Sequence, residues 1–276
     1  MTVTFVDDGR TVSAQHTTTG RPGPRVLPTL ILYPALGRDH GPAARGATPA
    51  AGPFPTVVFA PGFDRDPSSY LPLLTSWARA GFVVVAITFP LTNPHAIGGL
   101  DESDIVNQPR DVRFVITQVL RSSRSGSGRL SGLVDPGRLA VAGHSDGSET
   151  AILVAASSCC RDPRVRALIV MAGALLPPGS YFSSASPPTM VMQGTADTIS
   201  QPANAMRVYR IAQSPKYLLS LEGADHLSPF AGVGPYERVV RTVSIAFLER
   251  YLNGASQRIR LAGGERAIAS LRRDAG

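Results

Sequence analysis

Short apolar segments alternate with amphipathic segments along most of this chain, and this alternation restricts the fold more than any other feature of the sequence. The apolar segments are continuous and rich in β-branched residues, which is typical of strands buried on both faces of a parallel sheet. They lie at residues 29–34, 56–60, 82–89, 138–143, 167–173, 189–194 and 217–223. Segments with helical spacing of apolar residues lie between or after them, at 68–81, 102–123, 204–213 and 236–252.

The alternation predicts an α/β fold with a mainly parallel, twisted sheet and helices on both faces. Pro109 is expected in the first turn of one of these helices. We expect a single domain over residues 1–276, with its core at 26–252 and a tail at 253–276 that either forms a short amphipathic helix or frays. The loop at 174–188 is too short for a separate cap domain, whereas 90–108 is long enough to arch over one end of the sheet.

Composition excludes several classes of function. No apolar run reaches the length of a membrane span, and the first residues lack a secretory signal. The chain therefore reads as cytoplasmic, or as secreted if it is a mature segment. The net charge of +7 comes from scattered arginines rather than from a basic stripe with interleaved aromatic residues, so no nucleic-acid partner is expected. The oligomeric state stays open.

The two cysteines, Cys159 and Cys160, are adjacent in the sequence. A bond between neighbouring cysteines is strained, and two cysteines without nearby histidines fall short of a zinc site. We therefore expect buried free thiols, no metal and no organic cofactor.

A Gly-x-Ser-x-Gly box occurs at residues 143–147, as "GHSDG". Such a box is informative only where a strand precedes it and a helix follows it. Here the apolar segment 138–143 precedes it, and a helix-forming segment rich in alanine and aliphatic residues follows. This context favours Ser145 as a nucleophile on a strained turn.

A serine needs a base and an acid that orients the base, and in this architecture they follow in the order serine, acid, histidine. His226 is the only histidine after Ser145, so it is the predicted base. Asp197 follows the apolar segment 189–194 and is the predicted acid. Asp225 adjoins the histidine and is expected to point elsewhere.

Acyl transfer also needs two hydrogen-bond donors for the developing oxyanion. The backbone N–H of Asp146, directly after the nucleophile, is one predicted donor. The other is the N–H of Phe63, which stands in the Pro-Gly-Phe turn after the segment 56–60.

Four motifs in this order resemble those of the α/β-hydrolase superfamily: "APGFDRDPSSY", "GHSDGS", "GTADTI" and "GADHLSP". Within it, the chain is similar to the branch that holds dienelactone-hydrolase-like esterases, platelet-activating-factor acetylhydrolases, chlorophyllases and cutinase-like polyester hydrolases. The resemblance implies a triad of Ser145, Asp197 and His226 with an oxyanion hole from the amides of Phe63 and Asp146.

Three features depart from the polyester hydrolases. Asp146 stands where they usually carry methionine, the only tryptophan is Trp77 in a helical segment, and their C-terminal disulfide is absent. The preferred prediction is therefore a carboxylesterase for neutral, short- to medium-chain esters, with polyester hydrolase or lipase-like activity as the alternative. The Asp146 side chain is a candidate filter against anionic substrates. Aromatic contacts to substrate are expected from a set of four residues: Phe63, Tyr70, Tyr181 and Phe182.

Other classes remain open at this level. A peptidase or amidase would use the same triad, and a non-catalytic binding protein of this fold would normally have lost part of it. A haloalkane dehalogenase would carry aspartate in place of Ser145.

Overall fold

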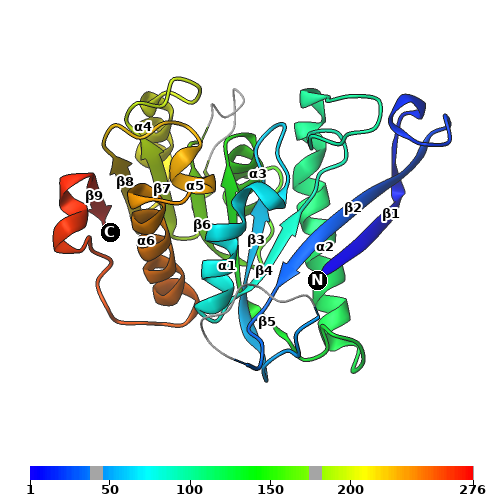
Figure 1. The fold of residues 1–276 in the computed structure, drawn as a ribbon, viewed down its shortest axis with the longest axis horizontal. Helices are drawn as coiled ribbons and strands as arrows, with labels where there is room; N and C mark the ends of the chain where they lie inside the picture. The colour runs from blue at the N-terminus through cyan, green and yellow to red at the C-terminus, as the bar shows by residue number, and fades with distance from the viewer. Residues whose placement is uncertain (38–45, 174–181, 276) are drawn as a thin grey trace.

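The computed structural model describes residues 1–37, 46–173 and 182–275, and its centre is a nine-stranded sheet (Figure 1). The spatial order of the strands is β1-β2-β4-β3-β5-β6-β7-β8-β9. The strands are β1 (Thr2–Val12), β2 (Gly23–Leu32), β3 (Phe54–Ala60), β4 (Val83–Ile87), β5 (Val134–His144), β6 (Val165–Met171), β7 (Thr189–Gly194), β8 (Lys216–Leu221) and β9 (Ala269–Asp274).

The central strands β4, β3, β5, β6, β7 and β8 are parallel to one another, whereas β1, β2 and β9 pair antiparallel at the two ends of the sheet. The mainly parallel sheet is confirmed. The segments expected as strands from their apolar runs correspond to β2 through β8.

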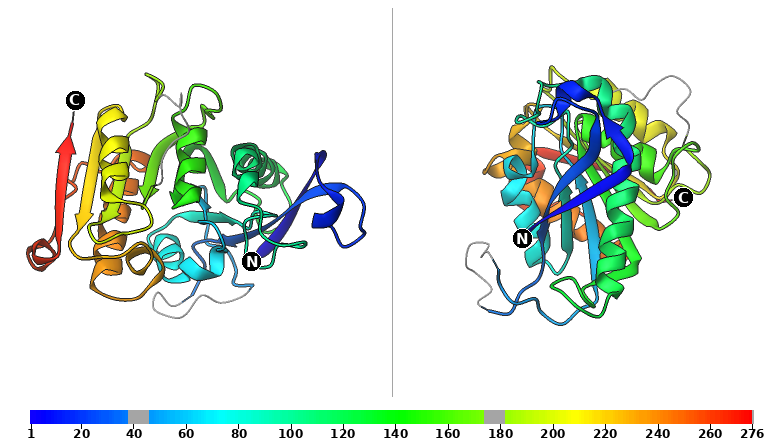
Figure 2. Two further views of the ribbon diagram at one scale, coloured as in Figure 1. Left: turned by 90° about the horizontal axis from the view of Figure 1, so that it is seen from above. Right: turned by 90° about the vertical axis from the view of Figure 1, so that its right-hand side faces the viewer.

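Helices cover both faces of the sheet, as predicted (Figure 2). One apolar cluster contains the inner faces of α1 and α6 together with α5, and the other contains those of α2, α3 and α4. Pro109 lies in the first turn of α2, as expected. The α-helices are α1 (Leu71–Arg79), α2 (Gln108–Arg124), α3 (Asp146–Ala155), α4 (Pro202–Ile211), α5 (Ser228–Ala231) and α6 (Pro235–Leu252). Short 3-10 turns are η1 (Ala14–His16), η2 (Pro67–Tyr70), η3 (Glu102–Asn107) and η4 (Gly263–Ala267). In the described part of the chain, no helix combines the length and apolar character needed to cross a membrane.

The expectation for the C-terminal tail is wrong. Instead of a helix or a frayed end, the tail forms η4 and then β9, which pairs antiparallel with β8 from Leu221 opposite Ala269 to Lys216 opposite Asp274. Leu271 packs against the core, so the strand covers an edge of β8 that would otherwise be open.

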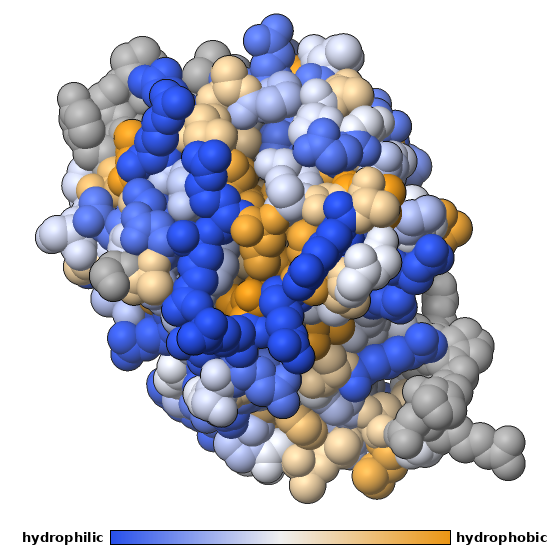
Figure 3. Space-filling view, turned by 90° about the vertical axis from the view of Figure 1, so that its left-hand side faces the viewer, coloured by the Kyte–Doolittle hydropathy of each residue, from blue (hydrophilic) through white to orange (hydrophobic). Residues whose placement is uncertain are grey.

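On the face seen in Figure 3, long hydrophilic side chains surround an apolar area.

A buried ion-pair cluster joins the β1–β2 hairpin to α2. The Arg25 guanidinium on β2 donates to both carboxylate oxygens of Asp104 and to both of Asp111, at 2.6–2.8 Å. Arg10 Nη2 lies 2.6 Å from Asp111 Oδ1. Since Asp104 belongs to η3, the cluster fixes the position of that turn.

The 90–108 segment is also held to α3, the helix that follows the box. Gln108 Nε2 donates to Thr92 Oγ1 at 3.0 Å, and its Oε1 accepts from Thr150 Oγ1 at 2.7 Å. These buried bonds hold the segment against α3, which begins directly after β5 and Ser145.

Candidate active site

The four motifs follow β3, β5, β7 and β8, all of which are parallel strands of one sheet. Parallel strands present their carboxyl ends at the same edge, and this edge is where α/β proteins bind ligands. The fold therefore brings the four motif loops together although they span more than half of the chain.

The turn between β5 and α3 holds the predicted nucleophile. Ser145 has φ 54° and ψ −125°, a conformation that residues with a side chain rarely adopt. A Cβ at Gly147 would overlap the carbonyl oxygens of Ala60 and Pro61, so this position requires glycine. The α3 helix begins at Asp146, directly after Ser145, so the N–H groups of its first turn are free of intrahelical partners next to the nucleophile.

The predicted acid and base contact each other. His226 Nδ1 lies 2.8 Å from Asp197 Oδ2, and the Asp197 side chain is fully buried. The other carboxylate oxygen, Oδ1, accepts from the backbone N–H groups of Ile199 and Ser200 at 2.9 and 2.8 Å. This arrangement fixes the carboxylate and leaves Nε2 as the imidazole nitrogen that can take a proton. The Asp225 carboxylate instead caps the turn that follows His226, as expected.

Gln193 is a site residue that the motifs did not identify. Its Nε2 donates to Asp197 Oδ2 at 2.9 Å and to the Ser200 carbonyl at 2.9 Å. In the sequence, Gln193 is the polar residue inside the apolar run "TMVMQG". A buried side-chain amide requires hydrogen-bond partners, and this feature could have indicated a polar neighbour such as Asp197.

The loop after β3 lies directly against the box. A Cβ built on Gly62 would lie 3.1 Å from Ser145 Cβ, so the loop backbone approaches the nucleophile closely. The Asp64 N–H donates to the Thr92 carbonyl at 2.9 Å, which holds the loop to the 90–108 segment. Phe63, between Gly62 and Asp64, is half-buried beside this approach.

Acidic side chains gather near the start of α3. Burial raises the pKa of the Asp146 carboxyl, the charge of Glu102 raises it further, and His226 lowers it. Burial and the charges of Asp146 and Glu102 raise the pKa of Glu149 to about 7. The surroundings of the candidate nucleophile therefore oppose negative charge.

Comparison with known proteins places the chain in a family. A family model described as PET hydrolase-like matches residues 40–270. The chain belongs to the PET hydrolase-like family.

One relative of this PET hydrolase-like protein is a bis(hydroxyethyl) terephthalate hydrolase from Streptomyces coelicolor, 28% identical over 205 residues. The match covers 73% of this chain and 58% of the relative, so the chain spans less than two thirds of that relative's length. A solved ferulic acid esterase from Streptomyces cinnamoneus is 21% identical with a TM-score of 0.75, and the match covers 98% of this chain and 94% of that one. The PET hydrolase-like chain thus has the α/β-hydrolase fold, and its described residues contain no separate cap domain.

The predicted aromatic contacts of this PET hydrolase-like protein need revision. Tyr70 is fully buried, with its hydroxyl turned to the protein interior, and the prediction that it contacts substrate is wrong. Phe182 forms a β-bridge with Ser157 beyond the end of α3 and packs against the core, at the opposite end of that helix from Ser145. Tyr181 lies outside the described residues.

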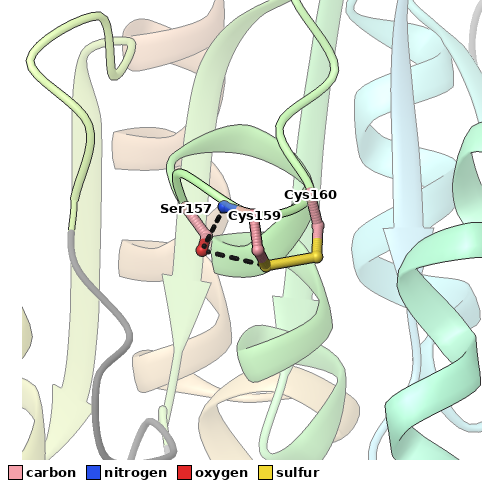
Figure 4. Close-up of a disulfide and its surroundings, with 3 residues drawn as sticks. All are labelled: Ser157, Cys159 and Cys160. Carbon is pink, nitrogen blue, oxygen red and sulfur yellow. Dashed lines mark hydrogen bonds between the residues drawn. A yellow bond between two sulfur atoms is a disulfide. The ribbon is translucent and has the colours of Figure 1, made fainter.

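The prediction of buried free thiols is also wrong. Cys159 and Cys160 of the PET hydrolase-like protein form a disulfide just after α3 (Figure 4), and Cys159 is exposed. Ser157 Oγ lies 3.3 Å from Cys159 Sγ and accepts from the Cys159 N–H at 3.4 Å. The two cysteines lie in a turn between α3 and β6, outside any helix or strand.

Proposed function

We propose that this protein is a serine esterase that works through a covalent acyl-enzyme intermediate. The observation that carries the proposal is the buried Asp197 carboxylate bonded to His226, whose backbone carbonyl oxygen lies 2.9 Å from His144 Nε2, next to the strained turn at Ser145. A triad is identified by this kind of geometry, in which a carboxylate orients the imidazole that activates a hydroxyl.

In the proposed mechanism, Ser145 Oγ attacks the ester carbonyl carbon while His226 Nε2 takes the hydroxyl proton. Asp197 stabilises the resulting imidazolium. The backbone N–H groups of Phe63 and Asp146 donate to the negatively charged oxygen of the tetrahedral intermediate. His226 then gives its proton to the alkoxide as the C–O bond breaks, and an alcohol leaves. A water molecule, deprotonated by His226, attacks the acyl-enzyme and releases the acid and Ser145.

We further propose that the substrates are neutral esters with short or medium acyl chains. Burial raises the pKa values of Asp146 and Glu149, so these surroundings already disfavour negative charge and would also disfavour an anionic substrate near Ser145. The relative from Streptomyces coelicolor is named for a neutral ester, which supports neutral esters as the substrates of this protein.

Polyester hydrolysis is the second candidate. It is supported by the family to which the chain belongs and by two exposed apolar side chains, one on the loop that carries Asp197 and one between α5 and α6. These are Ile199, which is 74% exposed, and Val233, which is 83% exposed. Apolar residues at these positions would contact a hydrophobic polymer surface.

Active-site labelling tests the esterase proposal. A fluorophosphonate probe should label the wild type and the exposed-serine control Ser127→Ala, but not Ser145→Ala. Absence of labelling of the wild type between pH 6 and 9 would refute it. Turnover of p-nitrophenyl esters, bis(hydroxyethyl) terephthalate and a solid polyester film then separates the substrate classes. A maximum at long acyl chains, or a preference for anionic acyl groups, would contradict the proposed specificity.

A further inference from the structure

His144, the variable residue of the Gly-x-Ser-x-Gly box, is buried and uses both ring nitrogens. Its Nδ1 lies 2.9 Å from the Tyr70 hydroxyl, and its Nε2 lies 2.9 Å from the backbone carbonyl oxygen of His226. The ring also packs against the rings of Tyr70, His226 and Phe230, with centroid separations of 5.5, 4.8 and 5.2 Å. Such a side chain is held in one orientation.

The partners determine where the protons lie. A carbonyl oxygen only accepts, so His144 Nε2 must carry a proton and donate to His226. Burial lowers the pKa of His144 to about 3, which makes the ring neutral at physiological pH. Its Nδ1 is therefore an acceptor, and the Tyr70 hydroxyl donates to it.

Tyr70 continues this series of hydrogen bonds to the loop after β3. Its oxygen accepts from the Gly62 N–H at 3.3 Å, and burial raises the pKa of the phenol so that it keeps its proton. The hydrogen bonds thus run from the Gly62 amide through Tyr70 and His144 to the His226 carbonyl.

This series of hydrogen bonds connects the two loops that the proposed mechanism uses. Gly62 directly precedes Phe63, the proposed oxyanion donor, and His226 is the proposed base. The first loop is bonded to Tyr70, which contacts His144, and the second is bonded to His144 itself. His144 belongs to the box and directly precedes Ser145 in the sequence. The structure therefore contains a physical link that sets the donor and the base relative to the nucleophile.

We propose that Tyr70 and His144 are positioning residues for catalysis, and this proposal rests on the proposed esterase function. They act through the backbones of Gly62 and His226 and contact neither the ester nor the transferred proton. Their value lies in rigidity, since a displacement of about 1 Å in a catalytic group can cost about 100-fold in rate.

The test compares Tyr70→Phe with Tyr217→Phe. Tyr217 is an equally buried tyrosine whose hydroxyl bonds to Tyr251 at 3.0 Å, outside the proposed site. Each variant loses one tyrosine hydroxyl from a buried ring, so the loss of a buried hydroxyl by itself is present in both variants. For Tyr70→Phe we expect kcat to fall about 10- to 100-fold with KM within about threefold, because the loss concerns the transition state. Tyr217→Phe should keep the wild-type kcat. Equal kcat values for the two variants would overturn the proposal.

Two substitutions of His144 provide a second test that does not depend on Tyr70→Phe folding. Glutamine can place its amide N–H near the position of Nε2 and restore the bond to the His226 carbonyl, whereas leucine restores neither bond. The expected order of kcat is wild type, then His144→Gln, then His144→Leu, and the rate of fluorophosphonate labelling should follow the same order. Equal kcat values for His144→Leu and wild type would refute the link. Failure of the esterase function itself would show differently, as a wild type that is not labelled at all.

Discussion

Replacing Arg25 with methionine tests how far the buried ion-pair cluster stabilises the fold. The Arg25 side chain is 2% exposed, and those of Asp104 and Asp111 are 3% and 0% exposed. Methionine fills a similar volume but leaves two buried carboxylates without their main partner. Breaking a buried ion pair in this way costs about 3–5 kcal/mol.

Remaining contacts place the expected loss at the lower end of that range. Asp111 keeps Arg10 at 2.6 Å, and Asp104 keeps the Asn107 Nδ2 donor at 2.7 Å. We therefore expect the free energy of unfolding to fall by about 3 kcal/mol, which corresponds to a Tm lower by roughly 6–12 °C for a chain of this size.

The loss should also depend on pH. Burial raises the pKa of Asp111 above its usual value, while Arg25 and Arg10 oppose that rise. A raised native pKa means that the stability contribution of this group is present below its unfolded pKa and is lost as pH rises through the native pKa. Removing Arg25 raises the native pKa further. The destabilisation should therefore be greater at pH 8 than at pH 5.

Urea unfolding followed by tryptophan fluorescence measures the effect, because the single tryptophan, Trp77, is fully buried. Arg138→Met is the matched control: its ion pair with Asp135 is partly exposed, at 34% and 26%, and should contribute at most about 1 kcal/mol. If Arg25→Met cost no more than Arg138→Met, the reasoning about the buried cluster would be refuted.

Three further predictions concern the site and its surroundings. Asp197→Asn should lower kcat about 10⁴-fold in a p-nitrophenyl ester assay, since the amide cannot hold the imidazole tautomer; a loss under tenfold would remove Asp197 from the proposed triad. Glu149→Gln should raise Tm at pH 8 but not at pH 4, because the stability contribution of a group whose pKa is raised to about 7 is present below its unfolded pKa and lost as pH rises through 7. Equal Tm changes at both pH values in differential scanning calorimetry would contradict this. Iodoacetamide under denaturing conditions should modify Cys159 and Cys160 only after reduction, and intact-mass analysis showing two modified thiols without reductant would disprove the disulfide.

The candidate site was largely predictable because its residues occur in short local motifs. The turn that exposes Ser145 requires small neighbours, and those glycines are visible in the sequence. The order of the acid and base after the nucleophile left one histidine, His226. Two edge strands, by contrast, were not predicted: β1 has alternating exposure, and β9 carries exposed arginines, so neither has the continuous apolar run typical of a buried strand.

By itself, the sequence determined the α/β class from local periodicity, and it gave Ser145, Asp197 and His226 as candidates from motifs that resemble those of the α/β-hydrolases. Only the tertiary structure decided the orientation of Tyr70, the link from Gly62 to His226 through His144, the pairing of β9 with β8 and the ionisation of Glu149. These features depend on contacts between residues far apart in the chain and on burial. Neither quantity is contained in a local pattern, so they emerge only when the sheet brings its strand ends together.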